Sequence, residues 1–194
     1  MIINIVVTGV GGQGVVSATD IISMFALSAG YDVKKSDVHG MAQRGGAVVS
    51  FVRYGEKIYS PVVEEGHADY LIALEEMEVL RGIRFLKDDG IIILSNFHTP
   101  PPDVALGYKE YPVNIIEDIK KNKPYSKCYL ADVENMLKQY PQYSINMYLL
   151  GIFARALSYE QALWINAIKQ RFKKPDNAVE SFLYGYKNII KEIL

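Results

Sequence analysis

The hydrophobic positions change their period at a glycine-rich segment near the start of the chain. Residues 2–7 form a nearly continuous β-branched run, which is typical of a strand in a parallel sheet covered on both faces. From Val15 onward the apolar residues recur every three or four positions, as on one side of a helix, at Val15, Ala18, Ile22, Phe25, Ala26 and Ala29. We therefore predict a strand that leaves the sheet at Thr8, a turn over Gly9–Gly14 and a helix that ends at Gly30.

Strand-length apolar segments alternate with helical ones along the rest of the chain. Strands are expected at residues 31–36, 47–54, 69–74, 90–94 and 127–131, with residues 57–60 pairing back on 47–54 through a turn at Gly55-Glu56. Helices are expected at residues 75–86, 113–121, 145–157, 158–172 and 175–194, the fourth with a capping box formed by Ser158 and Gln161. Three consecutive prolines at 100–102 disfavour helix and central strand, so residues 95–111 are expected to form an exposed connection.

These elements predict an α/β fold of three layers, in which a mixed, mostly parallel sheet has helices on both faces and is followed by a helical C-terminal part. At 194 residues the chain is long enough to bury roughly 70% of its unfolded surface as a single domain. We expect residues 1–131 to form the α/β core and residues 132–194 to form the helical part of the same domain.

Charge and hydropathy disfavour two classes of partner. The formal net charge is -1, from 21 basic and 22 acidic residues, and no segment concentrates lysine and arginine as a nucleic-acid or anionic-lipid surface does. The apolar runs have the length of strands, and Met1 leads directly into the first of them, so we expect neither a membrane span nor a signal peptide. The sequence therefore predicts a cytoplasmic protein that binds no nucleic acid and no membrane.

Cysteine and histidine content argues against a metal centre within this chain. Cys128 is the only cysteine, so the chain has no internal disulfide and cannot by itself hold an iron–sulfur cluster, which needs about four thiolates. The three histidines, His39, His67 and His98, are too scattered in sequence to form a local ligand pattern. We predict no metal site.

The glycine-rich turn carries the first candidate chemistry. Gly9, Gly11 and Gly14 satisfy the spacing G-x-G-x-x-G, and they bring free N–H groups and the positive end of a helix dipole to one place, where a phosphate can bind. Gly12 and Gln13 complete the turn. A dinucleotide site also needs an acidic residue about 20 positions further on, for which Asp37 is the plausible candidate and Asp32 is not. A nicotinamide- or flavin-binding reductase and a tight turn without a ligand both remain alternatives.

A second glycine-rich segment, residues 37–46, follows the expected second strand. It contains three glycines and three long hydrogen-bonding side chains, and loops of this composition commonly serve binding sites. Arg44 lies between Gln43 and the glycine pair Gly45-Gly46, where a guanidinium fork is suited to grip a carboxylate or phosphate. An ordinary solvated loop is the alternative.

Together these two segments, with Arg53, resemble the gamma-type domain of the 2-oxoacid:ferredoxin oxidoreductases. The form His-Gly-Met-Ala-Gln-Arg-Gly-Gly at residues 39–46 is most similar to the small beta subunits of the indolepyruvate:ferredoxin oxidoreductases within that family. Further marks of the resemblance cover nearly the whole chain: Ser60-Pro61, Ala68-Asp69, Glu75 and Glu78 with Arg81, Asn146 to Gly151, and Asn177 with Phe182 and Gly185.

The resemblance implies a subunit of a heteromeric enzyme that oxidatively decarboxylates aryl 2-oxoacids such as indolepyruvate, with coenzyme A as co-substrate and ferredoxin as electron acceptor. In that family a large partner subunit holds thiamine diphosphate, Mg and the iron–sulfur clusters, so this chain is expected to bind none of them alone and to carry no catalytic residue. Its expected contribution is to assembly and to the wall of the active-site or coenzyme A pocket, with a pure scaffold as the alternative. The candidate pocket residues are Gly9, Gly11, Gly12, Gln13, Gly14, His39, Gln43, Arg44, Gly45, Gly46 and Asn146.

Overall fold

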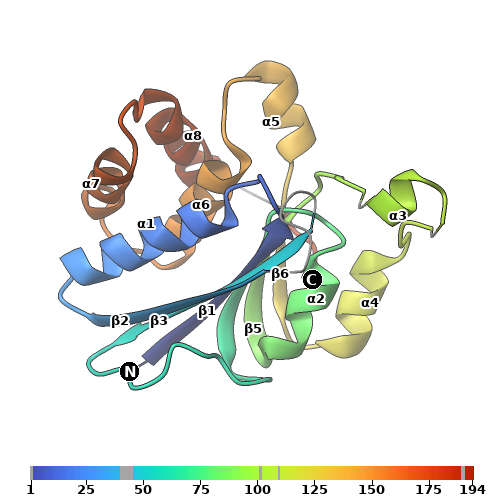
Figure 1. Ribbon diagram of the computed structural model, residues 1–194, viewed down its shortest axis with the longest axis horizontal. Helices are drawn as coiled ribbons and strands as arrows, with labels where there is room; N and C mark the ends of the chain where they lie inside the picture. Colours follow the sequence, from blue (N-terminus) through green and yellow to red (C-terminus); the bar gives the residue numbers. More distant parts are fainter. Residues whose placement is uncertain (1, 40–45, 101, 109, 189–190) are drawn as a thin grey trace.

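The computed structural model describes residues 2–39, 46–100, 102–108, 110–188 and 191–194 (Figure 1). The described residues form a seven-stranded sheet with the strand order β2-β3-β1-β4-β5-β6-β7. The strands are β1 (Ile2–Val10), β2 (Asp32–His39), β3 (Ala47–Gly55), β4 (Ala68–Ala73), β5 (Leu86–Ser95), β6 (Lys127–Ala131) and β7 (Lys191–Glu192).

The sheet is mixed, with a parallel centre. β1, β4, β5 and β6 are neighbours and pair in parallel, whereas β3 runs antiparallel to both β1 and β2, and β7 runs antiparallel to β6. Only β3 and β7, among the described strands, therefore oppose the direction of β1. The prediction of a mixed, mostly parallel sheet is confirmed.

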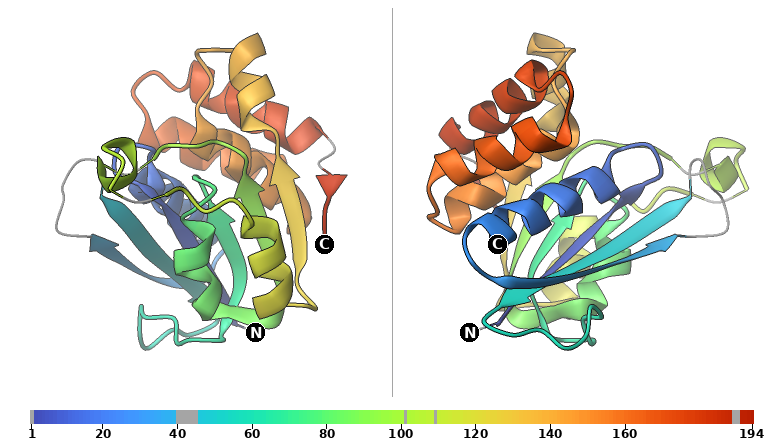
Figure 2. Two further views of the ribbon diagram at one scale, coloured as in Figure 1. Left: turned by 90° about the vertical axis from the view of Figure 1, so that its right-hand side faces the viewer. Right: turned by 60° about the vertical axis from the view of Figure 1, so that its left-hand side comes forward.

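Helices cover both faces of this sheet, which confirms the three-layer architecture. Figure 2 shows α1 and α6 to α8 on one face and α2 and α4 on the other. The helical segments are α1 (Val15–Ser28), α2 (Val79–Gly82), the 3-10 turn Ile83–Phe85, α3 (Pro102–Ala105), α4 (Ile115–Asn122), α5 (Val133–Gln139), α6 (Ile145–Ala156), α7 (Gln161–Arg171) and α8 (Asp176–Lys187).

β1 is buried on both sides, as its β-branched sequence predicts. Ile5 and Val7 face the core beneath α1 and α6 to α8, while Val6 faces the core beneath α2 and α4. In the first core the fully buried Trp164 of α7 stacks on Phe25 of α1, with ring centroids 3.9 Å apart. The hydrophobic burial thus fixes α1 against the sheet directly after the glycine turn.

Two glycines let α6 and α8 cross in close contact. A Cβ atom on Gly151 would lie 2.0 Å from the Phe182 carbonyl oxygen, and one on Gly185 would lie 2.1 Å from the Tyr148 carbonyl oxygen. Side chains at these positions would push the helix backbones apart. Gly185 and Phe182, identified from the sequence as marks of the family, therefore lie at a helix crossing.

Several expected strand boundaries are wrong. β1 does not end at Thr8 but continues to Val10, because Gly9 and Val10 pair with Val48 and Ala47 of β3. Residues 57–60 form no strand, and the expected hairpin is absent among the described residues, because β1 and β2 occupy both sides of β3. β2 extends to His39 rather than ending at 36.

Some expected helices are also wrong. Residues 75–86 form only the short α2 and the 3-10 turn, and β5 begins at Leu86 rather than at 90. The 95–111 connection contains α3, which begins at the last of the three prolines, a position where a missing N–H costs a helix nothing. Ser158 is not a helix cap, since α7 is preceded by Glu160. The last helix ends at Lys187, and β7 follows it and pairs with β6.

Other boundaries agree with the sequence. β6 has the expected bounds, and α4 and α6 lie within two residues of theirs. Gly30 has a φ of 87° and follows α1 as expected, with the Tyr31 N–H donating to the Ala26 carbonyl. None of the helices in the described part of the chain is long and apolar enough to span a membrane.

Candidate functional site

The glycine turn joins β1 to α1 through two residues in left-handed conformations. Gly12 has a φ of 103° and Gly14 a φ of 84°, values that glycine adopts without a Cβ penalty. Gly9 lies within β1, where a Cβ would come within 2.9 Å of both the Gln13 Oε1 and the Val15 side chain. The glycines therefore serve the tight joint between strand and helix.

The side chain of Gln13 braces the turn from inside. Its Oε1 accepts from the Val10 N–H at 2.8 Å, while its own backbone N–H donates to the Val10 carbonyl at 3.0 Å. Its Nε2 donates to the Thr99 Oγ1 at 3.1 Å, on the connection that follows β5. Gln13 thus joins the turn to a segment 86 residues away.

Asn146, at the start of α6, closes the other side of the turn. Its Nδ2 donates to the Gly14 carbonyl at 3.1 Å, and its Oδ1 accepts from the Met147 N–H at 2.9 Å. A Cβ on Gly14 would lie 2.3 Å from that Nδ2. Position 14 must therefore be glycine for two reasons, its backbone conformation and its contact with Asn146.

The second glycine-rich segment comes to the same end of the sheet. The Gly11 N–H donates to the Gly46 carbonyl at 2.9 Å, immediately before β3. Val48 of β3 pairs with Gly9 on one side and with His39 on the other. The glycine turn and the two described ends of the second segment, His39 and Gly46, therefore lie together at this end of the sheet. Gln43, Arg44 and Gly45 lie outside the described residues, and the side chain of His39 is not described either.

The start of α1 is suited to contact an anion. Gly14 precedes the helix without a side-chain cap, and the first turn contains no acidic residue. The N–H groups of a first helical turn have no partners within the helix, and the helix dipole adds a partial positive charge there. The start of α1 is therefore a candidate site for a phosphate or carboxylate group, and the anion site stays a prediction.

A buried carboxylate lies beside the turn, and the sequence did not reveal this arrangement. Glu75 is fully buried; its Oε1 accepts from the Tyr111 hydroxyl at 2.6 Å and from the Thr99 N–H at 3.1 Å, and its Oε2 accepts from the Glu78 N–H at 3.1 Å. Thr99 in turn accepts from Gln13. Glu75 thereby holds the 95–111 connection against the glycine turn. The sequence feature that could have pointed to Glu75 is the position of an acidic residue directly after the apolar run 69–74.

Burial shifts the acid–base behaviour of this network. Burial, the hydrogen bond to Glu75 and its charge raise the pKa of the Tyr111 hydroxyl well above its usual range, so it acts as a donor. Burial also raises the pKa of Glu78, although Arg81 opposes that shift through a bond from its Nε to the Glu78 Oε2 at 2.9 Å. Of the family marks Glu75, Glu78 and Arg81, Glu75 is therefore linked to the turn through Thr99, while Glu78 bonds to Glu75 and to Arg81.

Arg53 and Ser60, which the sequence also singles out, lie away from the glycine turn. Arg53 donates to the Asn4 Oδ1 at 2.8 Å and to the carbonyls of Ser60 and Val62, near the opposite end of β3. These bonds explain Arg53 and Ser60 as fold-stabilising residues.

The geometry gives no support to a dinucleotide site. In the sheet β3 separates β2 from β1, whereas the ribose-binding acid of a dinucleotide fold follows the strand next to the glycine turn. Asp37 forms an ion pair with Lys35 at 3.1 Å, and Asp32 accepts from the Ile58 N–H at 2.8 Å. No group of three or more metal-ligating side chains occurs in the part of the chain that the structure describes.

Comparison with known proteins identifies the family. The family model described as pyruvate ferredoxin/flavodoxin oxidoreductase matches residues 4–187. Indolepyruvate oxidoreductase subunit IorB of Thermococcus kodakarensis is 35% identical over 199 aligned positions, which cover 98% of this chain and 97% of that protein. Subunit IorB of Archaeoglobus fulgidus is 44% identical over 126 positions, covering 64% of this chain and 62% of that protein.

Solved structures confirm the fold. Pyruvate oxidoreductase subunit PORC from Thermotoga maritima superposes with a TM-score of 0.73 at 21% identity, covering 100% of this chain and 99% of that one. A 2-oxoglutarate:ferredoxin oxidoreductase from Magnetococcus marinus, with 2-oxoglutarate, coenzyme A and succinyl-CoA bound, gives 0.71 at 18% identity over 95% of this chain and 30% of that one. The chain belongs to the pyruvate ferredoxin/flavodoxin oxidoreductase family, as the resemblance in its two glycine-rich segments predicted.

Proposed function

We propose that this chain is the small subunit of a heteromeric, cytoplasmic indolepyruvate oxidoreductase that forms acyl-CoA and passes electrons to ferredoxin. The observation that supports the proposal is the similarity to subunit IorB of Thermococcus kodakarensis, which extends over nearly the full length of both chains. The subunit contributes to assembly and to the wall of the active-site or coenzyme A pocket, while a larger partner subunit performs the redox chemistry.

The residues of this chain do not fit an iron–sulfur cluster. Cys128, the single cysteine, lies buried in β6, and burial raises the pKa of its thiol to about 12. A cluster needs about four deprotonated thiolates. In this proposal the clusters belong to the partner subunit.

Thiamine diphosphate and Mg also belong to the partner in this proposal. The sequence contains no Gly-Asp-Gly segment of the kind that the family uses for the diphosphate-bound metal. What this chain offers is the uncapped start of α1, held in place by Gln13 and Asn146. Such a group of fixed N–H donors is suited to a phosphate of coenzyme A or a carboxylate of the substrate or partner, because it needs no rearrangement on binding.

Co-purification from the native source tests the proposed assembly. We expect a larger, cysteine-rich protein to elute with this chain, and we expect the complex to reduce ferredoxin in the presence of indolepyruvate and coenzyme A. Elution of this chain alone, or with a partner that has too few cysteines for a cluster, would contradict the proposal.

A substitution of Arg44, in the second glycine-rich segment, distinguishes a pocket-wall role of this chain from a purely structural role. Arg44→Lys keeps the charge but loses the planar two-point grip on an anion. We expect the isolated chain to remain as stable as wild type, while kcat/KM of the complex or affinity for the partner falls by about tenfold, equal to about 1.4 kcal/mol. Arg84→Lys is the matched control, because Arg84 is an exposed residue with a long ion pair to Glu65, at 3.5 Å, and its contact with the Phe85 ring, at 4.8 Å, is open to a lysine as well.

Measuring affinity and turnover on one preparation assigns the role of Arg44. Loss of affinity alone places Arg44 at the interface between subunits, whereas loss of turnover at full occupancy places it at the active site. If neither quantity changes, Arg44 is an ordinary solvated charge, and its pocket-wall role is wrong.

A further inference from the structure

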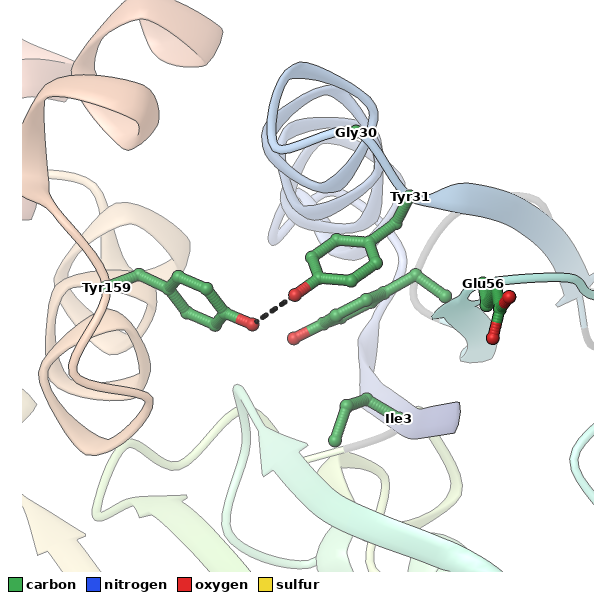
Figure 3. Close-up of a pocket in the computed structure, with 6 residues that line it drawn as sticks. Ile3, Gly30, Tyr31, Glu56 and Tyr159 are labelled. Atoms are coloured by element: carbon green, nitrogen blue, oxygen red, sulfur yellow. Dashed lines mark hydrogen bonds between the residues drawn. The ribbon is translucent and has the colours of Figure 1, made fainter. Parts of the chain in front are cut away.

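A hollow lies at the opposite end of β1 from the glycine turn. It has a volume of about 390 Å³ and is lined by Ile3, Gly30, Tyr31, Tyr54, Glu56 and Tyr159 (Figure 3). These residues come from the start of β1, the end of α1, the end of β3 and the connection between α6 and α7. The size falls in the range of small-molecule pockets, and a water molecule takes up only about 30 Å³.

Three tyrosines line this cavity, and the hydrogen bonding of their hydroxyls is incomplete among the described residues. The Tyr31 and Tyr159 hydroxyls bond to each other at 3.0 Å, the dashed contact in Figure 3. Tyr54 is only 1% exposed, and its hydroxyl has no partner in the described part of the chain. A buried hydroxyl without a partner is costly, so a group that bonds to it gains free energy on binding.

The charges and dipoles around the cavity favour a cation. Gly30 follows the C-terminal end of α1, the negative end of the helix dipole, and the last turn of α1 has no basic residue. Glu56 places a carboxylate in the lining, and the faces of the tyrosine rings carry partial negative charge.

No lysine or arginine occurs among the described residues that line the cavity. Lys34 of β2 forms an ion pair with Asp32 at 3.9 Å, and Glu56 forms no ion pair among the described residues. The negative charge of Glu56 and the dipole of α1 are therefore left for a bound ligand to balance.

We propose that this cavity binds a primary alkylammonium group. The hydrocarbon stem packs on Ile3 and the tyrosine rings, and the ammonium N–H groups donate to phenol oxygens. Glu56, at the other end of the tyrosine rings in Figure 3, and the end of α1 attract the positive charge over a longer distance. The group comes either from a free amine or from a lysine side chain of a partner subunit. The inference rests on the cavity alone and holds whether or not the proposed function is correct.

Titration of the purified chain with n-butylammonium chloride, followed through the NMR signals of the tyrosine rings, tests this proposal. n-Butanol is the neutral control of similar shape, and sodium chloride is the control for ionic strength. We expect saturable shifts with n-butylammonium only. Equal shifts with n-butanol, or no saturable shift with either compound, would overturn the proposal.

Matched variants check that binding occurs in this cavity. Glu56→Gln removes one exposed carboxylate from the lining and is expected to weaken n-butylammonium binding by about threefold, as for an exposed ion pair. Glu117→Gln removes the same charge from an exposed position of α4 and is expected to leave binding unchanged. Tyr54→Phe keeps the ring and removes the unpartnered hydroxyl, so binding is expected to weaken without loss of stability. If Glu56→Gln and Tyr54→Phe both bind as wild type does, the ammonium group binds elsewhere.

The native complex distinguishes the two sources. If n-butylammonium still binds to the complex, the cavity serves a free amine. If binding is lost and a lysine of the partner becomes protected from acetylation, that lysine fills the cavity. Loss of binding without a protected lysine counts against the proposal.

Discussion

The side-chain amide of Asn146 donates to the Gly14 carbonyl at 3.1 Å, across 132 positions of sequence. The same carbonyl accepts from the Ala18 N–H at 2.9 Å, the first hydrogen bond of α1. A residue of the C-terminal helices thus contacts the start of α1, where the candidate anion-binding groups lie. The geometry of the glycine turn therefore depends on α6 as well as on the local sequence.

The contact between Gly14 and Asn146 predicts a difference between two glycines of the turn. Gly12→Ala meets no atom within 4 Å and suffers only from its positive φ, at a cost of about 1–2 kcal/mol. Gly14→Ala has the same backbone penalty and also displaces the Asn146 amide, so we expect it to destabilise the chain by about 1 kcal/mol more.

Urea denaturation of both variants measures these costs, and Asn146→Ala completes a double-mutant cycle with Gly14→Ala. We expect the extra cost of Gly14→Ala to disappear in the Asn146→Ala background. Equal costs for Gly12→Ala and Gly14→Ala would show that the Asn146 contact is too weak to hold the turn.

Glu75 is predicted to be critical for the 95–111 connection. It accepts from three donors, whereas a glutamine has a single acceptor oxygen, so Glu75→Gln leaves at least one buried donor without a partner. We expect a loss of about 2 kcal/mol in the free energy of unfolding. Tyr111→Phe leaves the carboxylate with its other two donors but also removes the acceptor of the Met77 N–H, which donates to the Tyr111 hydroxyl at 3.1 Å. Because Tyr111 and Met77 are only partly buried, a smaller loss is expected. A cost for Glu75→Gln below that of Tyr111→Phe would contradict this view of the network.

An ion-pair network predicts a specific pH dependence of stability. Asp20 of α1 contacts Lys35 of β2 at 2.5 Å and Arg171 of α7 at 2.9 Å. Burial alone would raise the pKa of Asp20, but hydrogen bonds and charges from Lys35 and Arg171 outweigh it and lower the pKa below its ordinary value of 3.8. A lowered folded-state pKa stabilises the protein above pH 3.8, and this stabilisation is lost as pH falls through the folded-state value.

Asp20→Asn is therefore expected to cost about 1 kcal/mol at neutral pH, and the cost is expected to shrink as the solution becomes more acidic than the folded-state pKa of Asp20. Thermal unfolding of wild type and variant across that pH range measures it. Asp89→Asn, at an exposed position, is the control and is expected to have little effect. A cost that stays constant with pH would show that Asp20 acts through something other than its charge.

We propose that residues 1–131 and 132–194 unfold as one unit. Trp164 and Phe182 of the C-terminal helices share a core with Phe25 of α1 and Ile5 of β1. Far-UV circular dichroism reports the whole chain, whereas fluorescence of Trp164, the single tryptophan, reports the C-terminal part. We expect the two signals to show coincident urea transitions. An earlier transition in fluorescence would divide the chain into two units.

Sequence patterns predict the structure well where contacts between residues close in sequence determine it. The switch from β-branched residues to helical spacing places β1, the glycine turn and α1 almost correctly, because period and glycine conformation act over a few residues. Gly30 was likewise identified by the rule for helix ends.

The errors arise where partners distant in sequence decide the structure. The turn at Gly55-Glu56 suggested a hairpin, but β3 pairs with β1 and β2 and has no free side for residues 57–60. The bonds from Asn146 to Gly14 and from Tyr111 to Glu75 span 132 and 36 positions, and no periodicity reveals them. Asn146 was a candidate because of the family resemblance alone. The hydrogen bonds that give Glu75 its role are seen only in the structure.

The most direct test of the proposed function is indolepyruvate-dependent reduction of ferredoxin, measured for the isolated chain and for the complex purified from its native source. We expect the isolated chain to bind no iron and to show no turnover, because its single buried cysteine cannot hold a cluster. We expect turnover by the complex that contains the chain and its larger partner, with acyl-CoA as product. An iron–sulfur absorbance band or turnover in the isolated chain, or a complex that is inactive towards every aryl 2-oxoacid, would contradict it.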